Sequence, residues 1–116
     1  MNKKGEYMIR TFKQTSNFSK KWDSLGLGND ELIILENILL KNPEFGNVIQ
    51  GTGGIRKLRI PLNDKGKSSG GRVIYVDIEV KETIYLLDVY AKNEKINLTS
   101  KETKLLKNLV EILKEE

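Results

Sequence analysis

Residues 72–91 read RVIYVDIEVKETIYLLDVYA and contain the two clearest strands of the chain. In the first run the β-branched residues from Ile74 to Val80 recur at every second position, so they share one face. The second run is apolar on both faces apart from Asp88, which is typical of a central strand. The polar pair Lys81-Glu82 separates the two runs. This stretch therefore predicts a β-hairpin with a tight turn at those two residues.

Helical periodicity lies on both sides of the hairpin. Phe18, Trp22 and Leu25 fall on one face of a first helix, and a second apolar stripe follows a glycine-rich turn. Thr99 and Glu102 form the capping box of a C-terminal helix. The predicted elements are a strand at 7–12, helices at 17–25 and 30–41, strands at 55–60, 72–80 and 83–91, and the helix after residue 99.

The order β-α-α-β-β-β-α predicts an α+β fold with a small antiparallel sheet, an N-terminal helical hairpin and a C-terminal helix. Short strands that follow one another favour a meander, and we expect the helices on one face of it. The 116 residues are enough for one domain, 1–116. We expect Pro61 to interrupt or end the strand at 55–60.

Cysteine and histidine are both absent. Their absence excludes disulfides, catalytic triads built on histidine, and zinc sites of the usual nitrogen and sulfur type. No apolar run approaches the roughly 18 residues that a membrane span needs. The lysine-containing N-terminus lacks the apolar segment of a signal peptide. We therefore expect a cytoplasmic protein whose chemistry uses carboxylates, Lys, Arg, Tyr, Ser or the substrate itself.

The positive charge of the chain is concentrated in residues 56–72. This segment holds six cations and one acid, whereas the rest of the chain holds 14 cations and 15 acids. The six cations are Arg56, Lys57, Arg59, Lys65, Lys67 and Arg72. Such a cluster is the electrostatic footprint of polyanion binding, and it is equally compatible with a solvated basic hairpin.

Gly66-Lys67-Ser68 looks like the end of a nucleotide-binding P-loop. A P-loop needs a glycine five residues before its Gly-Lys pair and a helix directly after it. Pro61 stands at the first position, and the residues that follow predict a strand. The sequence therefore argues against a nucleotide site here.

Three quoted stretches resemble the HigB-like branch of the RelE/ParE superfamily of type II toxins. They are GTGGIRKLRIPLNDKGKSSGGRVIYVDI (51–78), TIYLLDVYAKNEKINLTSKE (83–102) and FSKKWDSLGLGNDELIILENILLKNPEFGNVI (18–49), and the resemblance runs from about Phe12 to Leu113. It implies a RelE-like fold with a curved antiparallel sheet. It also implies ribosome-dependent cleavage of mRNA in the A site of the 70S ribosome, without metal or other cofactor. The implied protein partner is a HigA-like helix-turn-helix antitoxin.

Two other functions remain open beside this one. A ParE-like, gyrase-inhibiting toxin would share the fold and act by protein contact. A non-catalytic module with the toxin fold would only bind its antitoxin. The density of Lys and Arg argues against the gyrase-directed alternative, since a ribosomal site demands contact with a polyanion.

Matching motif to motif, the resemblance assigns the working residues of the family to basic positions here. The expected catalytic residues are Arg56, Lys57, Arg59, Arg72, Tyr75 and Lys92, and the expected RNA-binding residues are Lys65, Lys67 and Lys95. Cations can stabilise the charge of a pentavalent phosphate, and a lysine flanked by other cations is one candidate for proton transfer. Two departures concern Asn93, where many relatives have arginine, and the chain after Tyr90, which lacks an aromatic residue.

Several of these residues have a structural alternative. Arg72 could pair with Asp77 or Glu79 in a neighbouring strand, and Arg56 could snorkel over the apolar face that it shares with Leu58. Tyr75 is equally compatible with a core position. Asp77, Glu79 and Asp88 lie on two strands without a further ligand, so we expect no metal site among them.

Overall fold

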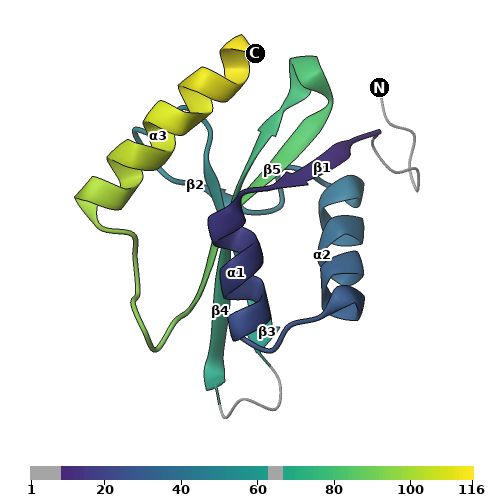
Figure 1. The fold of residues 1–116 in the computed structure, drawn as a ribbon, viewed down its shortest axis with the longest axis vertical. Coiled ribbons are helices and arrows are strands. Elements are labelled where there is room, and N and C mark those ends of the chain that lie inside the picture. The colour runs from purple at the N-terminus through teal and green to yellow at the C-terminus, as the bar shows by residue number, and fades with distance from the viewer. Residues whose placement is uncertain (1–8, 63–66) are drawn as a thin grey trace.

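The computed structural model describes residues 9–62 and 67–116, with the backbone alone for residues 67–69 (Figure 1). The helices are α1 (Ser16–Ser24), α2 (Asn29–Lys41) and α3 (Ser100–Glu115), together with the short 3-10 helix η1 (Glu79–Lys81). The strands are β1 (Thr11–Gln14), β2 (Asn47–Val48), β3 (Arg56–Leu62), β4 (Lys67–Ile78) and β5 (Thr83–Ala91). The predicted α+β order is therefore confirmed, with β2 as an added short strand. No helix in the described part of the chain is long and apolar enough to cross a membrane.

The five strands form one mixed sheet in the order β1-β5-β4-β3-β2. Strands β3 to β5 pair antiparallel, as predicted, and the added strand β2 pairs antiparallel with β3. Strand β1 instead pairs parallel with β5, from Thr11 opposite Thr83 to Gln14 opposite Leu86. The expectation of a wholly antiparallel sheet is thus wrong for β1. The helical hairpin provides the long connection that a parallel neighbour requires, so β1 can lie beside the last strand of the meander.

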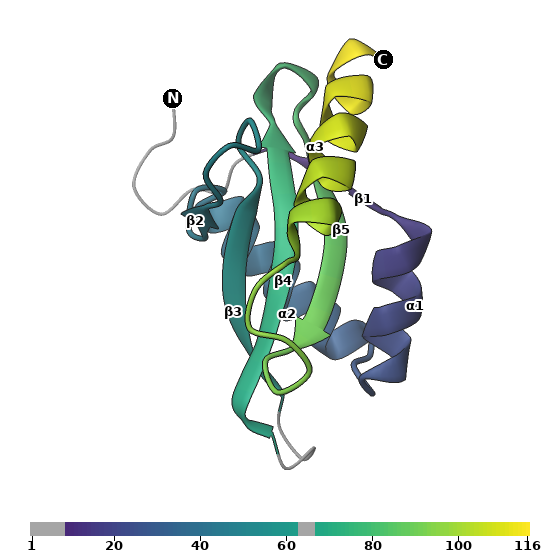
Figure 2. The same cartoon turned by 90° about the vertical axis from the view of Figure 1, so that its left-hand side faces the viewer.

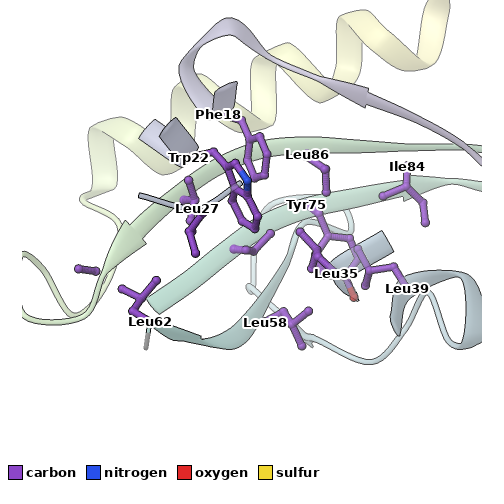
Figure 3. Close-up of a cluster of buried hydrophobic side chains, with 13 residues drawn as sticks. Phe18, Trp22, Leu27, Leu35, Leu39, Leu58, Leu62, Tyr75, Ile84 and Leu86 are labelled. Atoms are coloured by element: carbon purple, nitrogen blue, oxygen red, sulfur yellow. The ribbon is translucent and has the colours of Figure 1, made fainter. Parts of the chain in front are cut away.

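Helices cover both faces of this sheet, and the expectation that all would pack on one face is wrong. Figure 2 shows α3 in front of the sheet and α2 behind it. The α1–α2 face holds a core that includes the stacked rings of Phe18 and Trp22, 5.3 Å apart (Figure 3). The other core joins Ile74, Val76 and Leu87 to Val110 of α3. Strands β4 and β5 are apolar on both faces, so a helix on each side is needed to bury them.

Side chains at the helix starts fix where each helix begins. The Thr15 hydroxyl accepts the N–H of Phe18 and caps α1. In α3 the predicted capping box is confirmed: Thr99 accepts the N–H of Glu102, and the Glu102 carboxylate accepts the N–H of Thr99. The α3 helix is therefore anchored at its first turn.

Two irregularities set the register of the central hairpin. The turn is not the predicted two-residue one, because η1 is followed by Glu82 in the left-handed conformation, with φ of 49°, and Ile78 pairs with Thr83. Val80 is 91% exposed instead of sharing the apolar face. A bulge in β5 then shifts the pairing by one residue at Leu87.

Strand β3 also departs from its predicted bounds. It continues through Pro61 to Leu62, with a register irregularity between Ile60 and Leu62. An irregular pairing accommodates a residue that has no N–H to donate to the ladder.

Candidate nucleic-acid interface

Three side chains form a row across the central strands on the face covered by α3. Arg59 of β3 pairs in register with Arg72 of β4, and Arg72 pairs with Tyr90 of β5. Residues directly opposite one another in neighbouring strands share a face. Tyr90 belongs to the core on the α3 side, which places the whole row there. Lys57 lies two residues before Arg59 and therefore shares this face. We call these four residues, Lys57, Arg59, Arg72 and Tyr90, the basic row.

The cations of the basic row have no acidic partner among the described residues. The ion pairs found in that part of the chain join Arg10 to Asp77, Lys21 to Asp88, Arg56 to Glu44 and Lys95 to Glu102. Arg72 is only 5% exposed, and its guanidinium donates to the carbonyl oxygen of Gly71 over 3.0 Å. The alternative in which Arg72 pairs with Asp77 is wrong, because Arg10 donates two hydrogen bonds to that carboxylate, of 2.7 and 2.9 Å.

Lys57 makes one contact beyond the sheet. Its ammonium donates to the amide oxygen of Asn97, 2.9 Å away, in the segment that joins β5 to α3. Figure 2 shows this segment passing in front of the sheet before α3 begins. The connection therefore lies on the same side of the sheet as the basic row.

Tyr90 is the residue of the row that the sequence analysis did not select. Its hydroxyl is the one buried side-chain polar atom without a hydrogen-bond partner in the described part of the chain. Burial raises the pKa of Tyr90, while the nearby charge of Arg72 acts in the opposite direction. The ammonium of Lys95 lies 4.8 Å from the centre of the Tyr90 ring and 2.6 Å from a carboxylate oxygen of Glu102.

Tyr75 and Arg56 were expected in the catalytic set, but they lie on the opposite face. The Tyr75 hydroxyl donates to the carbonyl of Pro43 over 2.8 Å and accepts the N–H of Gly46 over 2.9 Å. Arg56 donates to the carbonyl of Gly46 over 2.7 Å. Both side chains therefore hold the segment after α2 against the sheet. Tyr75 is fully buried, and its position is the core alternative of the sequence analysis.

The remaining predicted cations lie at the ends of strands. Lys92 directly follows β5 and is half-buried, and its backbone N–H donates to the carbonyl of Gly70 over 3.0 Å. Lys95 lies over Tyr90, as described above. Lys65 lies outside the described residues. Lys67 begins β4, and its side chain also lies outside the described part.

The two aspartates of the central strands, Asp77 and Asp88, are engaged in contacts with basic or amide groups. Asp88 accepts from the Lys21 ammonium over 3.0 Å and from the Asn17 amide over 3.1 Å. Among residues 9–62 and 67–116 no group of three or more Asp, Glu, His or Cys side chains is placed to hold a metal ion. The chemistry open to the basic row is therefore the binding of an anion by guanidinium, ammonium and hydroxyl groups.

Comparison with known proteins places these residues in a family. The family model described as the RelE toxin of the RelE/RelB toxin–antitoxin system matches residues 10–115. An E. coli RelE mutant in the free state has a TM-score of 0.56 and 20% identity, and the match covers 77% of this chain and 90% of that one. The RelE–RelB complex from Pyrococcus horikoshii OT3 gives a TM-score of 0.51 and 22% identity over 76% of this chain and 100% of that one.

Proposed function

The chain belongs to the RelE toxin family, and from this premise we propose that it is a ribosome-dependent endoribonuclease that cleaves mRNA in the ribosomal A site. Family toxins generally have this activity. The observation that carries the proposal is the basic row, in which Lys57, Arg59 and Arg72 share one face without an acidic partner in the described part of the chain. A polyanion would supply the missing negative charge.

The proposed reaction is attack of the RNA 2′-hydroxyl on the adjacent phosphate, with departure of the 5′-oxygen. Arg59 and Arg72 pair in register on neighbouring strands. They would bind the non-bridging oxygens, whose charge increases in the transition state. Lys57 would exchange its contact with Asn97 for the RNA. Positioning of the codon by the ribosome would supply a further part of the rate enhancement.

We assign the remaining cations to the RNA backbone. Lys92 and Lys95 follow β5, and Lys65 and Lys67 precede or begin β4 in the glycine- and serine-rich segment. Contacts of this kind raise affinity without reading sequence. They would hold the mRNA along the sheet while Arg59 and Arg72 engage the phosphate that is cleaved.

The proposed partner is an antitoxin. The motifs in 51–78 and 83–102 resemble the HigB-like branch, so we propose a HigA-like helix-turn-helix antitoxin and a cytoplasmic location. Toxin–antitoxin complexes are known among the structural relatives: the E. coli RelBE complex has a TM-score of 0.52 and 22% identity, covering 72% of this chain and 94% of that one.

The test is a translation reaction with purified 70S ribosomes and a short mRNA, read by primer extension. The intact protein should cut within the A-site codon, and Arg72→Ala should cut at least about 100-fold more slowly, as expected for loss of a donor to the transition state. Lys20→Ala removes an equal charge from an exposed position on α1 and serves as the control. Uncut mRNA with the intact protein would refute the proposal, and growth arrest with DNA damage would then favour the gyrase-directed alternative.

A further inference from the structure

Two tyrosines of the central strands differ in how their hydroxyls are satisfied. The Tyr75 hydroxyl, on the α2 side, has two backbone partners. The Tyr90 hydroxyl, on the α3 side, is equally buried but has none among the described residues. Burying a hydroxyl without a partner costs about 1–3 kcal/mol. The unpaired hydroxyl therefore calls for an explanation beyond packing, since phenylalanine would fill the same space at lower cost.

The groups around the Tyr90 hydroxyl indicate what it would bind. Arg72 is its register partner and affects its pKa through its charge, and Lys95 lies over its ring. Two carboxylates, those of Asp88 and Glu102, raise the pKa of Tyr90 through their charge. Asp88 is paired with Lys21, and Glu102 is paired with Lys95. Arg72 has no carboxylate partner among the described residues. A hydroxyl beside such a guanidinium is suited to donate to an anion that the guanidinium attracts.

We propose that Tyr90 is a further RNA-contacting residue of this site, and that its hydroxyl donates a hydrogen bond to the phosphate bound by Arg72. This inference rests on the proposed function, because the phosphate is that of the mRNA. The row Arg59, Arg72 and Tyr90 then presents two guanidiniums and one hydroxyl to the same phosphate from three adjacent strands. The hydroxyl adds a neutral donor that fixes the phosphate relative to the sheet.

Access to Tyr90 depends on Lys95. Tyr90 is 2% exposed, and the side chain of Lys95 covers its ring while bound to Glu102. A surface pocket of about 430 Å³ lies where the end of α1 meets the end of β5, and it is lined by Tyr90 and Lys95 together with Lys21, Ser24, Leu25, Val89 and Glu94. The Lys95–Glu102 pair is partly exposed, so exchanging the carboxylate for an RNA phosphate costs little. Movement of Lys95 toward the RNA would uncover the hydroxyl.

Tyr90→Phe separates this role from a structural one. The variant keeps the ring and removes a hydroxyl that makes no bond within the described part of the chain, so its melting temperature should equal or exceed that of the intact protein. Ribosome-dependent cleavage should fall about 10- to 100-fold, as expected for loss of a hydrogen bond to a charged group. Tyr75→Phe is the matched control, and it should lower the melting temperature while leaving cleavage at 20 °C within about twofold.

Each other outcome has a defined meaning. Cleavage by Tyr90→Phe at the rate of the intact protein would overturn the inference, and so would a lowered melting temperature, which would reveal an internal partner. If the intact protein cuts no mRNA, the proposed function fails. The inference is then tested by binding to ribosomes that carry a 2′-deoxy A-site codon. Weaker binding of Tyr90→Phe than of the intact protein supports the phosphate contact. Equal binding of the two proteins, or no detectable binding, overturns the phosphate contact. The inference would also be overturned if Tyr90→Phe lost binding to the antitoxin and kept the cleavage rate of the intact protein.

Discussion

Arg59 and Arg72 lie directly opposite each other on β3 and β4, with no carboxylate paired to either one among the described residues. Like charges at directly opposed positions of an antiparallel pair destabilise a sheet. Elsewhere in the same strand the opposite arrangement occurs, since Asp77 of β4 is fully paired with Arg10. The fold thus tolerates repulsion at one place on β4, and a bound polyanion would relieve it.

Arg59→Ala should therefore separate stability from activity. Removing one of two opposed charges should leave the free energy of unfolding unchanged or raise it by up to about 1 kcal/mol. Cleavage of ribosome-bound mRNA should nevertheless fall at least about tenfold. Urea denaturation and primer extension measure the two effects. A variant that is less stable than the intact protein would show that Arg59 makes a favourable contact within the fold.

Binding to the ribosome–mRNA complex should weaken with salt in a residue-specific way. Each phosphate contact that is lost reduces the slope of log K against log salt concentration by about 0.7–0.9. Arg59→Ala should show this smaller slope when binding is measured from about 50 to about 200 mM KCl, the range over which counterion release strongly affects affinity. Lys20→Ala, an exposed change on α1, should keep the slope of the intact protein. Equal slopes for both variants would argue against a phosphate contact of Arg59.

The Arg10–Asp77 pair should be a stability element without a role in cleavage. Both side chains are largely buried, at 7% and 10% exposure, and the hydrogen bond to Asp77 raises the pKa of Arg10. Arg10→Ala leaves the Asp77 carboxylate buried without its partner, which should cost about 3–5 kcal/mol. The double variant Arg10→Met, Asp77→Leu should recover most of this loss in urea denaturation. Cleavage by the double variant should match that of the intact protein.

The sequence indicated that Lys57 and Arg59 share one face of their strand, but not that Arg72 and Tyr90 lie on the same face of the sheet. Alternation alone separates Lys57 and Arg59 from Arg56, and the structure keeps that separation. A two-residue turn at Lys81-Glu82 would instead have placed Val73 opposite Tyr90. The 3-10 turn and the bulge at Leu87 change the register, and a shift of one residue turns a side chain to the other face. Neither irregularity has a clear signal in the local sequence.

Tertiary packing explains the other differences between the structure and the sequence-based expectations. The capping box of α3 was visible in the sequence, but its side of the sheet was not, because strands apolar on both faces accept helices on either one. The parallel pairing of β1 likewise depends on where the helical hairpin returns the chain. Tyr75 illustrates the same limit: its partners lie about thirty residues away, so only the folded chain shows that its hydroxyl is satisfied.

The start of α3 should lose stability in acid because of Glu102. The hydrogen bond from Lys95, and next the N–H of Thr99, lower the pKa of Glu102 below its ordinary value of 4.5. A carboxylate with a lowered pKa stabilises the fold above its unfolded-state value, and this contribution is lost as the pH falls through the folded-state value. Thermal unfolding followed from pH 7 to pH 3 should show this loss below about pH 4.5.

Glu102→Gln tests the assignment, because the amide can still accept the N–H of Thr99 but cannot titrate. Its melting temperature should be lower than that of the intact protein at pH 7, and the two should converge as the pH falls toward 3. Glu111→Gln, an exposed change farther along α3, should leave the pH profile of the intact protein unaltered. Parallel profiles of Glu102→Gln and the intact protein would place the acid-sensitive group elsewhere. Because this change frees Lys95, it should not slow mRNA cleavage.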